Sequence, residues 1–192
     1  MRVHKALPAL ALMASVVACA PQGQDRQQAQ DGAKPDLSSP AAAFLKTPEA
    51  LREEHREIHA VLERATAEPG DLGAAARELG GVLDPHFRRE EEIATPPLSL
   101  LVPLSQGPVT VEMRAVLPMT EALEREMPQM LAEHARIREA LERFEAAARL
   151  ANNAEYVRFS EALAHHARQE EEIFYPAAIV VGRFVAASQA AR

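Results

Sequence analysis

Apolar residues recur every three or four positions along four stretches of the chain that follow residue 46. In the first stretch Leu51, Ile58 and Leu62 lie seven and four residues apart, which is the spacing of one face of an amphipathic helix. Similar stripes run through residues 72–93, 123–144 and 156–173. No segment alternates with a period of two over a useful length. The pattern predicts an all-α fold, a four-helix up-down-up-down bundle.

Histidines and glutamates lie in phase with these apolar stripes. The second and fourth stripes each carry a histidine followed four residues later by a glutamate. On a helix such residues project from one face about 6 Å apart along the axis. The first and third stripes each carry a histidine alone. The six polar members of the stripes are His55, His86, Glu90, His134, His166 and Glu170.

The order of a lone histidine and then His-x-x-x-Glu occurs twice in the chain. Residues 86–96 and 166–176, which lie 80 positions apart, share a His, an Arg, three Glu, an Ile and a closing Pro. Residues 54–58 and 133–137 both begin with Glu-His and end with Ile. Inward imidazoles and carboxylates are costly unless they are paired or bind metal. We predict a metal site within the bundle; the alternative is a hydrogen-bonded network without metal.

The types of ligand indicate which metal this site would hold. Four imidazoles and two carboxylates are too many for one tetrahedral zinc and offer no sulfur to copper(I). They suit two ions that favour octahedral geometry, iron or, as the weaker candidate, manganese. Ferritin-like di-iron bundles use Glu-x-x-His, and this motif is absent from the sequence.

With these motifs, residues 47–176 resemble the hemerythrin family, the HHE cation-binding domains. The resemblance implies a four-helix bundle with a non-haem di-iron centre that binds O2 or NO, or that serves iron and redox stress responses. It also implies that the six polar stripe residues are the metal ligands, with Glu90 and Glu170 as carboxylate bridges.

Two positions differ from the oxygen-carrying members of that family. Those members have His-x-x-x-His on the third helix and an aspartate five places after the fourth-helix histidine, where this chain has Arg138 and Glu171. The sequence is closer to members with four histidines and two glutamates. His59, four residues after His55, is an additional candidate ligand, and the alternative places it at the rim of the site.

The remaining acidic residues of the motifs receive two different interpretations. We assign Glu91, Glu92, Glu171 and Glu172 to a solvated helix face. Glu54 and Glu133, each directly before a stripe histidine, are candidates to accept hydrogen bonds from imidazole N–H groups.

Two further segments remain, one within the predicted domain of residues 47–176 and one after it. The prolines of residues 95–117 are incompatible with a regular helix, so we predict a packed crossover loop there. Residues 177–192 form a C-terminal tail that is a candidate for one more short helix.

The N-terminus predicts export. Residues 1–18 have the basic start and apolar run of a secretory signal peptide, and Val16-Val17-Ala18-Cys19 resembles a bacterial lipobox in which Cys19 is lipidated. The alternative is an ordinary signal peptide that contains a cysteine. Residues 19–46 are rich in Gln, Asp, Ala and Pro and predict a flexible tether. The predicted location is the cell envelope, and Ala20 favours the periplasmic face of the outer membrane in a Gram-negative cell.

The predicted function follows from the metal site and the anchor. A formal net charge of −7 argues against nucleic-acid binding. We predict a protein that binds O2 or NO as a carrier, buffer or sensor, because the stripes carry no general acid or base beyond the ligands. The alternatives are an iron-dependent redox enzyme, acting in peroxide or NO detoxification or in iron donation and repair, and a simple metal-holding protein.

Overall fold

A computed structural model describes residues 45–190, and the regular elements in that range are all helical. Four long helices confirm the predicted all-α fold. They are α1 (Glu49–Thr66), α2 (Gly70–Ile93), α4 (Leu117–Leu150) and a composite fourth helix of α5 (Ala154–Gln169), the π turn η4 (Glu170–Phe174) and α6 (Tyr175–Ala190). The predicted signal peptide, Cys19 and nearly all of the predicted tether lie outside the described residues. Across residues 45–190, no helix has both the length and the apolar character needed to cross a bilayer.

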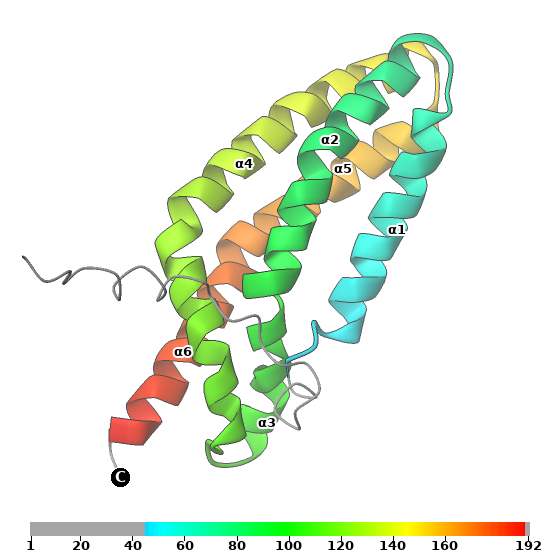
Figure 1. The fold of residues 1–192 in the computed structure, drawn as a ribbon. Helices are drawn as coiled ribbons and strands as arrows, with labels where there is room; N and C mark the ends of the chain where they lie inside the picture. Colours follow the sequence, from blue (N-terminus) through cyan, green and yellow to red (C-terminus); the bar gives the residue numbers. More distant parts are fainter. Residues whose placement is uncertain (1–44, 191–192) are drawn as a thin grey trace, which may run out of the picture. The chain divides into compact units, whose positions relative to one another are not determined.

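The four helices run alternately up and down (Figure 1). Short turns join α1 to α2 and α4 to α5, so each of these pairs is antiparallel. Gly70 and Asn152 supply the left-handed backbone at the two turns, with φ of +68° and +54°. The side chain of Asn153 then caps α5 by accepting hydrogen bonds from the backbone N–H groups of Glu155 and Tyr156.

The crossover between α2 and α4 is more helical than we predicted. It consists of the 3-10 turn η2 (Pro96–Leu100), the short helix α3 (Leu101–Gln106) and the 3-10 turn η3 (Glu112–Val116). The prediction of an irregular loop was wrong because proline is tolerated in the first turn of a helix, and Pro96 and Pro97 begin η2. Leu98 and Leu100 are buried, so this segment is packed as expected.

The bundle core has apolar layers on both sides of a polar layer. One cluster contains residues such as Leu83, Phe87 and Leu163, and a second contains residues such as Leu123 and Met130. Along α2, His86 and Glu90 lie between Leu83 of the first cluster and Ile93 of the second. The two apolar clusters therefore enclose the predicted ligands and separate them from both ends of the bundle.

The π turn η4 changes which side chains face the core. A π turn holds one more residue than an α turn, and it therefore rotates the residues that follow it. Ile173, which we predicted on the inward stripe, is 54% exposed, whereas Tyr175 is 1% exposed. Tyr175 therefore occupies the core position beside Glu170 that we had predicted for Ile173.

Candidate metal centre

All six predicted ligands lie together in the polar layer. Each is at most 2% exposed, and each long helix contributes at least one of them. His55 comes from α1, His86 and Glu90 from α2, His134 from α4, and His166 and Glu170 from the composite fourth helix. The 3.6-residue period places them inward, since each lies in phase with the buried apolar residues of its own helix.

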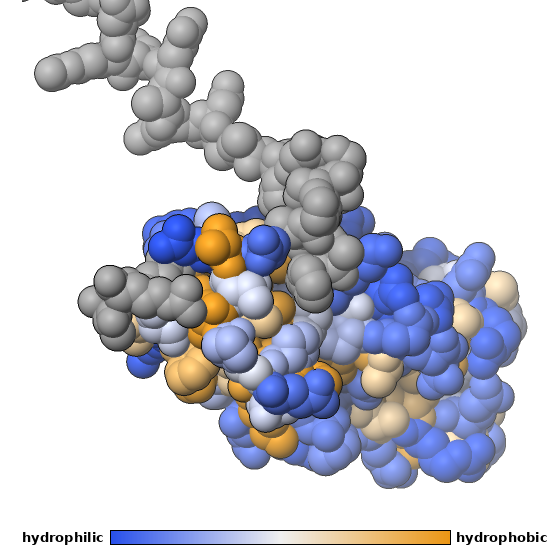
Figure 2. Space-filling view, turned by 90° about the horizontal axis from the view of Figure 1, so that it is seen from below, coloured by the Kyte–Doolittle hydropathy of each residue, from blue (hydrophilic) through white to orange (hydrophobic). Residues whose placement is uncertain are grey.

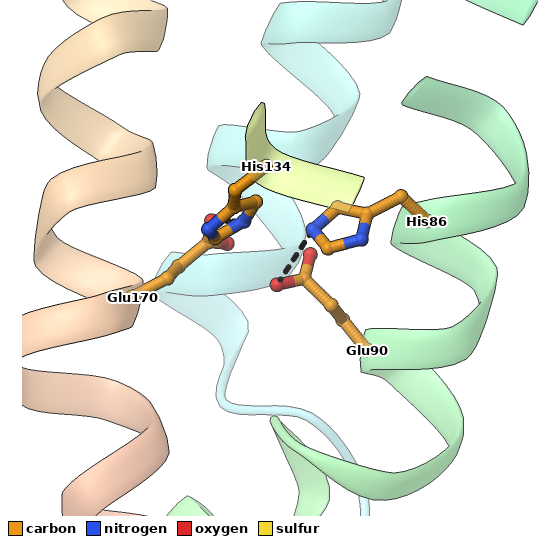
Figure 3. A group of neighbouring side chains, drawn as sticks. All are labelled: His86, Glu90, His134 and Glu170. Carbon is orange, nitrogen blue, oxygen red and sulfur yellow. Dashed lines mark ion pairs between the residues drawn. The ribbon is translucent and has the colours of Figure 1, made fainter. Parts of the chain in front are cut away.

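The six side chains form two donor groups that share one carboxylate. The first group is His86, Glu90, His134 and Glu170, whose side chains converge in Figure 3, and the second is His55, His166 and Glu170. Within each group the ligand atoms lie within 4.8 Å of one another. Glu170 places one oxygen 3.3 Å from His134 Nε2 and the other 2.7 Å from His166 Nε2. It is therefore positioned to bridge two cations.

Glu90 is the second inward carboxylate. One of its oxygens lies 3.4 Å from His86 Nε2 and the other lies 3.9 Å from His55 Nε2. Glu90 thus also lies between the two groups, although His55 is farther from it than His86. Only Glu170 belongs to both donor groups, so the bridging role of Glu90 stays a prediction of the family resemblance.

A ring of outer glutamates surrounds the four imidazoles. Each histidine turns Nε2 inward and places Nδ1 beside a glutamate of the next helix around the bundle. The four pairs and their Nδ1–carboxylate distances are His55–Glu91 at 3.4 Å, His86–Glu133 at 2.9 Å, His134–Glu171 at 2.8 Å and His166–Glu54 at 3.1 Å. Three of the four pairs are hydrogen bonds, which fix the ring orientation and raise the basicity of the inward nitrogen; the His166–Glu54 pair is a close contact without hydrogen-bond geometry.

This ring corrects one assignment from the sequence. We placed Glu91 and Glu171 on a solvated face. Glu91 is indeed 46% exposed and also lies beside His55, whereas Glu171 is only 25% exposed, lies 2.8 Å from His134 Nδ1 and accepts a hydrogen bond from Arg138 at 2.7 Å. Glu133 has the predicted hydrogen bond with His86 Nδ1, whereas Glu54 lies 3.1 Å from His166 Nδ1 without the geometry of a hydrogen bond. Helical rotation accounts for the correction, because the residue next to an inward ligand lies at the edge of the buried face, where it meets the neighbouring helix.

The sequence analysis missed Tyr175. Its buried hydroxyl donates a hydrogen bond to Glu90 and lies 3.3 Å from His134 Nε2 and 3.5 Å from His86 Nε2. The regular α-helical period did not place it inward, because the π turn is what rotates it there. The only signal was its position in the repeat, where it corresponds to Thr95, another buried polar residue.

His59 does not join the predicted ligands. Its side chain is 47% exposed, and its Nδ1 lies 3.5 Å from Asp84 Oδ1 on the outside of the bundle. The neighbouring ring is that of Phe87, at 5.4 Å between centroids. This placement agrees with the rim position and not with an additional ligand.

The pKa values of the two inward carboxylates are shifted in opposite directions. Burial and the charge of Glu170 raise the pKa of Glu90. Burial also acts to raise the pKa of Glu170, but the close imidazoles of His134, His166 and His55 hold that pKa well below its usual range. A site with one strongly ionised carboxylate and one that resists ionisation would gain from a nearby cation, which stabilises both charges.

Two of the histidines have strongly raised pKa values. Burial lowers the pKa of His86 and of His166, but the close carboxylate of the glutamate four residues on raises both pKa values to about 9. Burial and the charges of Glu90 and Glu170 raise the pKa of Tyr175, so this group remains a neutral phenol at pH 7. A metal ion would replace the protons that these imidazoles hold.

The buried polar atoms test whether a metal fits the site. Among the described residues, five buried side-chain atoms have no hydrogen bond. Three belong to the inward side of the donor groups, His55 Nε2, His166 Nε2 and Glu90 Oε2, and the other two are His166 Nδ1 and Arg52 Nε. His166 Nε2 lies close to Glu170, but its direction does not suit a hydrogen bond. Burying such atoms without a partner is costly. Metal coordination would satisfy the three inward atoms, and imidazole and carboxylate donors suit iron.

Comparison with known proteins agrees with this geometry. Residues 46–178 match the family model of the hemerythrin HHE cation binding domain. The chain belongs to the hemerythrin family. Neither the curated proteins nor the solved structures included a match to it.

Family membership and the buried donor groups lead to the same conclusion. A hemerythrin domain implies metal binding, typically of iron, and in this domain the buried histidines and glutamates are arranged as two groups that could hold metal ions. The chain therefore has the features of a metal-binding protein.

Proposed function

We propose that this hemerythrin domain holds a non-haem di-iron centre. The observation that carries the proposal is the pair of donor groups that share Glu170. His86 and His134 would bind one iron, His55 and His166 the other, and Glu90 and Glu170 would bridge them. Iron is favoured over manganese because the family typically binds iron.

The proposed role is the binding of O2 or NO, as a carrier, buffer or sensor. A di-iron centre supplies electrons that can be shared reversibly with either gas. The chain itself supplies four imidazoles flanked by the outer glutamates, and apolar layers that exclude water from the polar layer. These features favour a rigid, dry site, in which a bound gas is protected from protons.

A redox enzyme is the second candidate, and Tyr175 is the observation that favours it. Our preference for a binding protein rested on the absence of a general acid beyond the ligands, whereas Tyr175 is a buried phenol hydrogen-bonded to Glu90. A phenol at this position could donate a proton to a reduced oxygen or nitrogen species. Detoxification of peroxide or NO, or iron donation and repair, would use that property.

We further propose that Cys19 anchors the protein to a membrane of the cell envelope. The lipobox-like sequence before Cys19 supports this proposal, and Ala20 favours the outer membrane in a Gram-negative cell. Mass spectrometry of the mature N-terminus would test it. A lipid-modified Cys19 is expected, whereas a mature chain that begins elsewhere would contradict the anchor.

Metal content and the optical spectrum test the central proposal. The protein is expressed with iron, purified, reduced without air and then exposed to O2 or NO. Two irons per chain and a charge-transfer band that disappears under vacuum would support reversible binding. Irreversible oxidation would favour the enzyme, and a folded protein without metal would reject the di-iron proposal.

A further inference from the structure

We propose that the ligand reaches the centre through a pocket between α1 and α5 and binds on the side of His55 and His166. This inference rests on the proposed function and specifies which half of the centre is open. It also identifies the class of ligand, a small uncharged molecule. The argument depends on the walls of the pocket, on the position of Tyr175 and on the apolar layers at the ends of the bundle.

The pocket lies where α1 and α5 face each other and has a volume of about 190 Å³. His166 is one of its lining residues, so the pocket reaches the second donor group. Two other surface pockets lie beside α4, one lined in part by Val82 and Glu133 and the other by Arg138 and Arg168. Neither of these is lined by one of the four inward histidines.

Tyr175 closes the first donor group on the other side. Its hydroxyl lies within 3.5 Å of the Nε2 atoms of both His86 and His134 and is bonded to Glu90. It therefore fills the space beside these nitrogens that an external ligand would need. The residue that corresponds to Tyr175 in the first half of the repeat is Thr95. Its hydroxyl is hydrogen-bonded to that of Thr47 at 2.7 Å, so it does not fill the space beside the histidines of the second group.

Within residues 45–190, the end of the bundle that carries α3 offers no direct route to the centre. Hydrophobic side chains lie at the surface of the end that carries α3 (Figure 2), and Leu101 and Val102 are among the exposed ones. However, two closely packed apolar clusters separate this end from the histidines, one around Leu123 and the other around Val116. Among the described residues, the pocket between α1 and α5 is therefore the approach that reaches an inward histidine.

The pocket walls determine which ligand can use it. Apolar side chains supply most of the lining, including Ile58, Val61, Phe159 and Leu163, and the charged members are Glu54 and Glu57. No lysine or arginine lines it, and the carboxylates of Glu54 and Glu57 in its walls would repel an anion on its way to His166. The volume is below the roughly 300 Å³ at which organic-ligand pockets begin and well above the ~30 Å³ share of one water molecule. A neutral diatomic gas fits these limits.

A matched pair of valine substitutions tests the route. Val61 lines this pocket and Val82 lines the pocket beside Glu133; both are partly buried and pack against the same core cluster. Val61→Phe should narrow the proposed route, whereas Val82→Phe adds the same bulk elsewhere. In the full-length iron-loaded protein, we expect Val61→Phe to slow NO association by roughly tenfold, which corresponds to ~1.4 kcal/mol of added barrier. Val82→Phe should leave the rate within about twofold.

Equal rates for the two variants, or slowing only by Val82→Phe, would overturn the proposal. If Val61→Phe does not load iron, the test moves to xenon-pressurised crystals of the unmodified protein. Xenon density beside Phe159 and Leu163 would support the route, and its absence there would overturn it. Because xenon does not require iron, a protein that binds no metal would reject the di-iron proposal while still testing the pocket.

Discussion

The two halves of the hemerythrin domain carry the same ligand motif but end it differently. In the first half α2 ends at Ile93, three residues after Glu90, and the chain turns into η2. In the second half the helix continues from Glu170 through the π turn into α6, and Tyr175 enters the core. The repeated residues thus give a nearly symmetric ligand set, while the residues that follow them make the two sides of the centre different.

The largest expected effect comes from removing the carboxylate that both groups share. Glu170→Ala should abolish the binding of both irons, because each donor group loses a member. His86→Ala or His166→Ala removes a ligand from one group only and should lower the iron content by about half. Metal analysis of the purified variants measures this. Glu172→Ala is the control, since Glu172 is exposed; full iron content in Glu170→Ala would contradict the shared-ligand assignment.

The asymmetry at Tyr175 can be measured against the other tyrosine of the chain. Tyr175→Phe removes a buried hydrogen bond to Glu90, and we expect the free energy of unfolding of the iron-free protein to fall by ~2 kcal/mol. Tyr156→Phe removes a hydrogen bond of 3.2 Å to the partly exposed Glu68 and should cost ~0.5–1 kcal/mol. Denaturant titrations of both variants provide the comparison. An equal decrease in unfolding free energy for the two variants would mean that the buried Tyr175–Glu90 hydrogen bond stabilises the fold no more than the Tyr156–Glu68 hydrogen bond.

The continuation of the second half into α6 depends on a close contact at Gly182. A Cβ atom there would lie 2.1 Å from Thr120 Oγ1 of α4. Gly182→Ala should therefore destabilise the fold by ~1–3 kcal/mol through overpacking. A Cβ atom added at Gly81 of α2 would have no other atom within 4 Å, so Gly81→Ala should stabilise α2 by ~0.5–1 kcal/mol. The midpoint temperature of thermal unfolding should fall for Gly182→Ala and rise for Gly81→Ala. A shift of the same sign in both variants would be inconsistent with the α6–α4 contact.

The sequence predicted the parts of the centre that depend on regular helical geometry. The 3.6-residue period placed His55, His86, His134 and His166 inward, and the spacing of four placed Glu90 and Glu170 beside them. These residues meet in the structure because each shares a face with buried leucines. The family resemblance then related the same residues to iron.

The missed features depend on contacts between helices or on local departures from the regular period. The π turn at Glu170–Phe174 moves Ile173 outward and Tyr175 inward, and a constant period cannot express that shift. Glu91 and Glu171 look like surface residues along their own helices. Their contacts with His55 and His134 arise only when the neighbouring helix is in place.

The smallest effect concerns the two tight turns that begin the second helix of each half. Gly70 and Asn152 both have positive φ, but Gly70 has no Cβ, whereas Asn tolerates this conformation better than most residues. Gly70→Ala should cost ~1 kcal/mol of unfolding free energy, because the space around it is open and only the left-handed backbone is strained. Gly70→Asn should cost less, since it copies the residue used at the other turn. Denaturant titrations measure both unfolding free energies. A lower value for Gly70→Asn than for Gly70→Ala would show that the two turns are not equivalent.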